Sequence, residues 1–180
     1  MEDTHSLTTQ HMDPRSKIAS ASYMRNFVFG VEDSLVSTVG LLSGIAIAEV
    51  PPQTIFLTGI VLIFVEAFSM AVGSFLSEIS AEGYITRSET PTGTPIAGGF
   101  VMFFSYFVSG FIPLFPYIIF DVGTAFWFSI ALSLVSLFIL GVIGAKLSQT
   151  RILKNAVRML VIGGIAVAVG IAVGMLVPQY

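Results

Sequence analysis

Five long apolar stretches alternate with shorter polar ones along this chain. Each is about as long as the roughly 20 residues that an α-helix needs to cross a hydrocarbon layer. Lipid offers the backbone no hydrogen-bond partners, so only helices or closed barrels span it. The sequence therefore predicts an all-α bundle of five transmembrane helices. The expected segments are residues 27–49, 54–77, 95–119, 124–145 and 159–177.

The connections between these stretches are unequal. The first and second are joined by only a few residues, as are the third and fourth, which is typical of tight turns between antiparallel helices. The other two connections, residues 78–94 and 146–158, are longer and polar. Pro113 and Pro116 predict that regular helix kinks or ends within residues 111–117, because proline removes a backbone donor and clashes with the preceding turn.

The polar flanks predict an orientation. Residues 1–24 lack the apolar core of a signal peptide, so we expect them to form a cytosolic tail. The last part of this tail is expected to continue as a lead-in helix over residues 16–25. One membrane domain follows at residues 25–180. All 8 Lys and Arg residues fall on one side of the expected bundle. Under the positive-inside rule that side is cytosolic, which places the N-terminus inside and the C-terminus outside.

Composition agrees with an integral membrane protein. The 180 residues are 54% hydrophobic and 11% charged, whereas soluble domains carry about 25% charged residues. The absence of cysteine excludes disulfides, thiolate metal sites and iron–sulfur clusters. Both histidines, His5 and His11, lie in the polar tail, so no embedded imidazole is available as a ligand or proton carrier. We expect membrane lipid as a partner, and neither a cofactor nor nucleic acid.

The second stretch carries one polar stripe. Glu66, Met70, Ser74, Glu78 and Glu82 recur at every fourth residue, so they share one slowly winding helix face. Glu66 lies about 18 Å from the expected start of the helix, near the middle of the hydrocarbon layer. Intramembrane acids by default mark ion or proton pathways. Glu78 and Glu82 extend the stripe toward the cytosol, where they either gather cations at a pore mouth or form a solvated helix end.

The first stretch holds two further acids, Glu32 and Asp33, about 9 Å inside its cytosolic boundary. After Asp33, small residues recur on one helix face and favour the close approach of another helix. They are Ser37, Gly40, Gly44 and Ala48. Asp33 is therefore expected at the edge of a helix–helix contact; a satisfied polar contact, or a side chain that reaches the interface, is the alternative. No Lys or Arg lies within the expected segments, so the embedded acids are either protonated or paired with a cation.

The ligand types indicate which cation. Carboxylate and hydroxyl oxygens suit hard ions such as magnesium, calcium and manganese. Met70, one turn from Glu66, adds a thioether that favours a borderline ion such as ferrous iron or manganese; ordinary core packing is its alternative role. One chain offers too few ligands, whereas a two-fold dimer would double each acid around an axial path. The small-residue face of the first stretch is expected to supply the dimer surface.

Four pieces of the chain are informative when taken in order. They are residues 25–44 (RNFVFGVEDSLVSTVGLLSG), 67–80 (AFSMAVGSFLSEIS), 113–117 (PLFPY) and the basic loop that leads into Ile162-Gly163-Gly164. Together they resemble the vacuolar iron transporter family over nearly all of residues 25–177.

The resemblance implies a homodimer of five-helix protomers whose first two helices line a central path. It also implies export of ferrous iron or manganese from the cytosol in exchange for protons. Position by position, Asp33 matches the family's first-helix aspartate, and Met70 matches the methionine of its second-helix SM motif.

The chain departs from the family pattern at three places. Ser34 stands where a glycine follows the aspartate, and Ser74 stands where the family has an acid after the SM motif. Glu66 or Glu78, on the same stripe, can compensate for the missing acid. The third departure is residues 78–94, which are too short for the acid-rich cytosolic domain that larger members carry.

The sequence thus predicts a proton-coupled exporter of ferrous iron or manganese, and not an enzyme. Asp33, Glu66 and Met70 are expected on the path, and the other acids, Glu32, Glu78 and Glu82, at its cytosolic entrance. A carboxylate that binds either a proton or a metal couples the two fluxes by competition. The alternative is a membrane scaffold or metal-responsive partner that has lost transport. The expected location is the plasma membrane in a prokaryote or the vacuolar membrane in a eukaryote.

Overall fold

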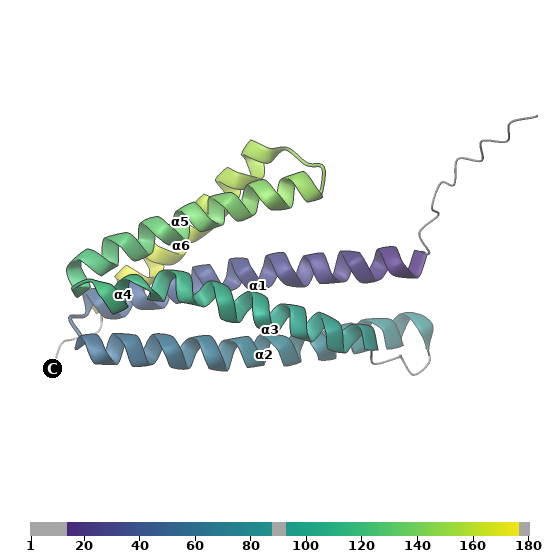
Figure 1. The fold of residues 1–180 in the computed structure, drawn as a ribbon, viewed down its shortest axis with the longest axis horizontal. Helices are drawn as coiled ribbons and strands as arrows, with labels where there is room; N and C mark the ends of the chain where they lie inside the picture. The colour runs from purple at the N-terminus through teal and green to yellow at the C-terminus, as the bar shows by residue number, and fades with distance from the viewer. Residues whose placement is uncertain (1–13, 88–92, 177–180) are drawn as a thin grey trace, which may run out of the picture.

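A computed structural model describes residues 14–87 and 93–176, and this part of the chain consists of helices joined by short connections and contains no strand (Figure 1). The elements are α1 (Pro14–Ile47), α2 (Pro52–Thr86), α3 (Gly93–Leu114), α4 (Pro116–Ile119), α5 (Val122–Leu147) and α6 (Ile152–Leu176). Five of them, all except α4, are long and apolar enough to cross a membrane. The prediction of a multi-pass, five-helix membrane protein is confirmed.

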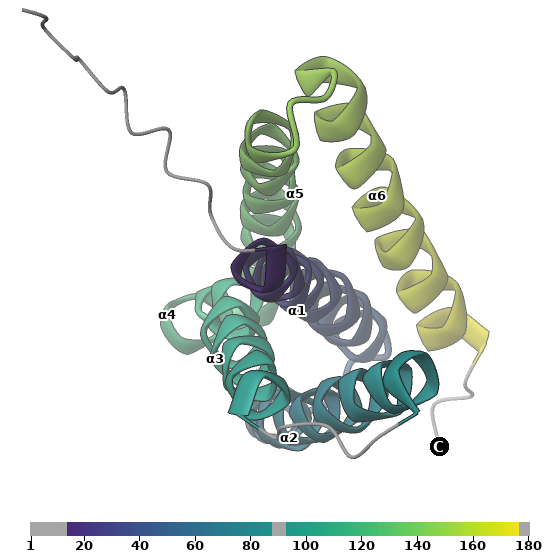
Figure 2. The same ribbon diagram turned by 90° about the vertical axis from the view of Figure 1, so that its right-hand side faces the viewer.

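Helix α1 is the centre of the bundle. It packs against α3, α5 and α6, whereas α2 packs mainly against α3 and less extensively against α1 (Figure 2). The start of α1, the end of α2 and the α5–α6 connection lie toward one end of the molecule, which we call the basic end because all the described Lys and Arg residues lie in these segments (Figure 1). The α1–α2 turn and the short α4 lie at the opposite end.

Helices α1 and α2 extend beyond their expected limits at the basic end. Helix α1 begins at Pro14, so the expected lead-in helix is continuous with the first membrane helix, while residues 1–13, with both histidines, lie outside the described residues. Helix α2 runs to Thr86, and its last carbonyls are capped by Arg87 in a left-handed conformation with φ 52°. The expected end of this helix at residue 77 is wrong. The helix continues through the polar residues after residue 77, because Glu and Ser are polar but compatible with helical geometry.

The proline-rich end of α3 behaves as expected. Pro113 lies in the last turn of α3, which ends at Leu114, and α4 begins at Pro116. The Ser129 hydroxyl of α5 donates a 2.7 Å hydrogen bond to the Pro113 carbonyl and so secures this irregular segment. Asp121 then caps α5 by accepting a 3.0 Å bond from the Thr124 N–H, which lowers the pKa of this exposed carboxyl.

The small-residue face of α1 packs against α6 of the same chain. A Cβ added to Gly44 would lie 2.6 Å from the carbonyl oxygen of Gly170, and one added to Gly170 would overlap the carbonyl of Gly40. Such backbone proximity is possible only without side chains. The helix that approaches Gly40 and Gly44 so closely is therefore α6 of the same chain, through Gly170 and Gly174. The dimer surface expected on this face of α1 stays a prediction.

Candidate metal pathway

The polar stripe of α2 lies on the inner side of that helix. Glu66, Met70, Ser74 and Glu82 are half-buried and Glu78 is buried. Residues on the opposite side are exposed, among them Phe68, at 66% exposure, and Leu76. The five residues thus share one face, as their four-residue spacing predicts.

Asp33 of α1 lies within electrostatic range of Glu66 on this stripe. The negative charge of Glu66 acts on the half-buried Asp33 carboxyl. Two carboxylates within electrostatic range in a membrane repel one another unless a cation or proton lies between them. The structure therefore brings together the two acids that the sequence predicts on the path, from two different helices.

Tyr106 of α3 adds a third polar group to this pair. Its side chain is fully buried, its hydroxyl lies 2.7 Å from the Ser37 hydroxyl, and both Asp33 and Glu66 act on it electrostatically. The sequence did not point to Tyr106, because it stands in the apolar run FFSYF of a helix that contains no acidic residue. A signal that could have identified it is the tyrosine itself, because a tyrosine hydroxyl inside a membrane helix needs a hydrogen-bond partner on a neighbouring helix.

Ser34, one of the departures from the family pattern, has a structural role. Its hydroxyl is fully buried and donates a 2.7 Å hydrogen bond to the backbone carbonyl of Tyr106. This bond ties α1 to α3 directly beside the acids. A glycine at this position could not make it.

Ser74, the second departure, contributes an unpaired hydroxyl. Its oxygen is buried, and it has no hydrogen-bond partner among the described residues. Buried polar atoms are normally bonded, and an exception requires an explanation such as an absent water or ion. Ser74 lies one helical turn from Met70 and two from Glu66, which makes the three residues one run of oxygen and sulfur ligands.

Glu78 makes a different kind of contact. Its carboxylate accepts hydrogen bonds from three α1 side chains: Ser22, Arg25 at 3.3 Å and Asn26 at 2.8 Å. Gly98 of α3 closes the site, since a Cβ there would lie 2.7 Å from a Glu78 oxygen. An arginine therefore neutralises this acid, and its burial contradicts the alternative of a solvated helix end for Glu78.

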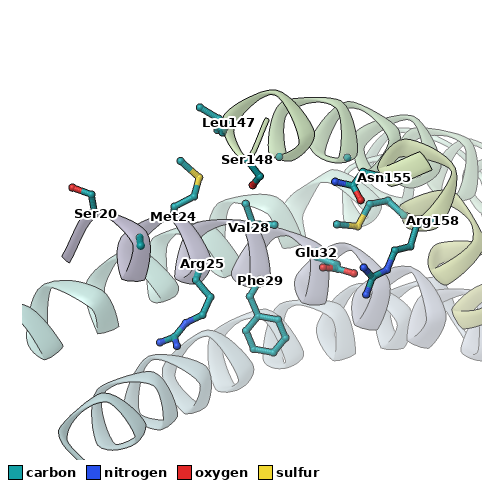
Figure 3. Close-up of a pocket in the computed structure, with 14 residues that line it drawn as sticks. Ser20, Met24, Arg25, Val28, Phe29, Glu32, Leu147, Ser148, Asn155 and Arg158 are labelled. Atoms are coloured by element: carbon teal, nitrogen blue, oxygen red, sulfur yellow. The ribbon is translucent and has the colours of Figure 1, made fainter. Parts of the chain in front are cut away.

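Glu32 projects from another side of α1. It lines a pocket of about 670 Å³ between α1, α5 and α6, where it faces Arg158 of α6 (Figure 3). Arg158 lies within α6 because that helix begins at Ile152, earlier than residue 159 as expected. Glu32 and Asp33 thus project from different sides of α1, although they are adjacent in sequence.

The arrangement groups several potential metal ligands on α1 and α2. Across residues 14–87 and 93–176, no three Asp, Glu, His or Cys side chains form a group that could hold a metal ion. One protomer instead contributes two facing carboxylates, one thioether and one unpaired hydroxyl. Hard and borderline divalent cations accept this mixture of ligands.

The comparisons with known proteins agree with this architecture. The family model described as VIT family matches residues 24–91 and 79–175. Vacuolar iron transporter homolog 3 of Arabidopsis thaliana is 27% identical over 162 residues, which cover 83% of this chain and 80% of that protein. Vacuolar iron transporter homolog 5 of Oryza sativa subsp. japonica is 27% identical over 172 residues, covering 88% and 81%. VIT-like transporter 1b of Glycine max is 25% identical over 168 residues, covering 83% and 73%. Since the family model accounts for most of the length, the chain belongs to the VIT family.

Proposed function

We propose that this protein carries ferrous iron or manganese across a membrane, out of the cytosol, in exchange for protons. The observation that carries the proposal is the pairing of Asp33 on α1 with Glu66 on α2, inside two membrane-spanning helices. Intramembrane carboxylates are costly and mark ion pathways. The names of the plant relatives, vacuolar iron transporter homologs, support iron as a cargo.

The ligand set supports a borderline ion. Glu66 and Asp33 provide oxygen, and Met70 provides a soft sulfur one turn from Glu66. Magnesium and calcium gain nothing from a thioether, whereas ferrous iron and manganese tolerate both donor types. Ser74 supplies a further oxygen at the position where the family pattern has an acid.

A two-fold homodimer would complete the site. One protomer supplies two carboxylates, and a second copy related by a two-fold axis would supply two more at the same depth. Beside the path, a groove of about 660 Å³ runs between α1 and α6 and is lined by Ser37, Val36 and Leu41. Gly40 and Gly44 also line this groove, which is the surface on which the partner helix would rest.

Proton coupling follows from the same carboxylates. Each can hold a proton or contribute to a metal ion, but not both at once, so the two cargoes compete. A proton gradient directed into the cytosol would then displace metal toward the opposite side. In this scheme Glu82 remains an acid at the cytosolic entrance on α2. Glu78 and Glu32 face arginines, and their main role is to hold neighbouring helices together.

The test is metal flux into proteoliposomes under a pH gradient, with ferrous iron and manganese as separate substrates. We expect uptake by the wild-type protein and its loss in Glu66→Gln and Asp33→Asn. Ser80→Ala is the matched control, because Ser80 is exposed on the same helix and its hydroxyl donates to the Leu76 carbonyl one turn earlier. Wild-type rates in both acid variants would refute the assignment of the path.

A second candidate function is a membrane scaffold that retains the bundle without transport. The observation in its favour is that Ser74 stands at the position where the family pattern has an acid. The same assay separates the two functions, since the scaffold predicts no flux of either ion under any gradient. Binding of metal without flux would also favour it.

A further inference from the structure

The pocket that holds Glu32 lies outside the metal pathway and has no role in it. It opens at the basic end, where the α5–α6 hairpin diverges from α1 (Figures 1 and 3). Along α1 it extends from Ser20 to Glu32, about 18 Å at 1.5 Å per residue. Its size and its position between membrane helices fit a lipid headgroup with its glycerol.

The hairpin beside this pocket is strongly basic. Helices α5 and α6 with their connection contain no acidic residue between Val122 and Leu176. Four cations, all exposed, lie near the turn: Lys146, Arg151, Lys154 and Arg158. None forms a salt bridge with a carboxylate in the described part of the chain, where the one such bridge is between Arg25 and Glu78.

Two arginines, Arg25 and Arg158, line the pocket together with Glu32 and largely apolar walls. Figure 3 shows Arg158 and Asn155 on the α6 side, with Met24 and Val28 of α1 directed toward the end of α5. The Arg25 guanidinium is engaged with Glu78. Arg158 faces Glu32 but forms no salt bridge with it among the described residues, so Arg158 is the cation available to an anion here. Arginine binds phosphate oxygens through a fork of N–H donors. The apolar walls cannot interact favourably with a free phosphate ion, but they can bury the glycerol and the first acyl methylenes of a lipid.

We propose that this pocket binds an anionic phospholipid of the cytosolic leaflet, with its phosphate on Arg158 and its glycerol and first acyl carbons against Met24 and Val28. Basic pockets between membrane helices bind anionic headgroups in this manner. Glu32, which faces Arg158 at the deep end of the pocket, repels additional negative charge. A lipid with a single phosphate and an uncharged headgroup, such as phosphatidylglycerol, therefore fits better than a polyphosphorylated one.

The experiment is a titration of the purified full-length protein in detergent with short-chain phosphatidylglycerol, read by native mass spectrometry. Short-chain phosphatidylcholine and inorganic phosphate are the comparison ligands. We expect phosphatidylglycerol to bind about tenfold more tightly than phosphatidylcholine, and inorganic phosphate not to compete. Equal binding of the two lipids, or full competition by inorganic phosphate, would overturn the proposal.

Three variants locate the site. Arg158→Gln should weaken phosphatidylglycerol binding about tenfold, whereas Lys154→Gln, which removes the same charge outside the pocket, should change it less than about twofold. Gly144→Leu should block the pocket without disturbing the fold, because Gly144 lines it and a Cβ there meets nothing within 4 Å. Equal losses in Arg158→Gln and Lys154→Gln would show a diffuse charge effect only. Unchanged binding in Gly144→Leu would place the lipid elsewhere. The readout is independent of metal transport.

Discussion

The side-chain amide of Asn26 donates a 2.8 Å hydrogen bond to the buried carboxylate of Glu78 and so joins the basic ends of α1 and α2. The two helices make fewer contacts with one another than each makes with α3. This polar junction, which Arg25 and Ser22 complete, is therefore a main link between the helices that carry Asp33 and Glu66.

We predict that Asn26→Leu destabilises the protein. It removes a donor from a buried carboxylate, and such a loss costs about 1–3 kcal/mol. Thermal unfolding in detergent, followed by the fluorescence of Trp127, should show a midpoint several degrees lower, on the scale of about 2–4 °C per kcal/mol. Ser80→Ala should leave the midpoint unchanged. An unaltered midpoint in Asn26→Leu would mean that the junction contributes nothing to stability.

The contact between α1 and α6 predicts a contrast between two glycines of α6. Gly170→Ala places a Cβ against the carbonyl of Gly40 and should cost about 1–3 kcal/mol through overpacking. Gly164→Ala, on the same helix, meets nothing within 4 Å and should be neutral or stabilise by up to about 1 kcal/mol through helix propensity. Chemical or thermal unfolding of both variants tests the contact, and equal effects would contradict it.

Tyr106 predicts a transport phenotype without loss of fold. Tyr106→Phe retains the buried ring but removes the hydroxyl bonded to Ser37 beside the two acids. If the hydroxyl holds the path in register, metal flux should fall about tenfold, which corresponds to roughly 1.4 kcal/mol in the barrier. Tyr84→Phe is the control, because Tyr84 is 88% exposed. Normal flux in Tyr106→Phe with an unchanged unfolding midpoint would restrict Tyr106 to packing.

Ser74 predicts a gain of function. Ser74→Glu places a carboxylate on the inner face of α2, where the unpaired hydroxyl now lies. Another negative ligand should tighten the binding of ferrous iron or manganese about tenfold, and calorimetry of the solubilised protein measures this directly. Ser77→Glu adds the same charge at an exposed position of the same helix and should have little effect. Equal affinities in the two variants would exclude a site beside Ser74.

Much of the fold could be predicted from hydrophobicity alone. Each apolar stretch had to become a helix, because lipid satisfies no backbone group, and the end of α3 follows from the geometry of Pro113 and Pro116. The four-residue spacing from Glu66 to Glu82 likewise determined that these side chains share one face of α2. The same local rules misplaced the end of α2, because polarity and helicity are independent properties.

Only the tertiary structure decided what each acid faces. Glu32 and Asp33 are neighbours in sequence, but successive helical residues point about 100° apart, so one faces Arg158 and the other Glu66. The partners of Glu78 are more than 50 residues away in sequence, and Tyr106 reaches the path from α3. Such long-range contacts depend on how helices pack, and the sequence of one helix does not encode which neighbour covers each of its faces.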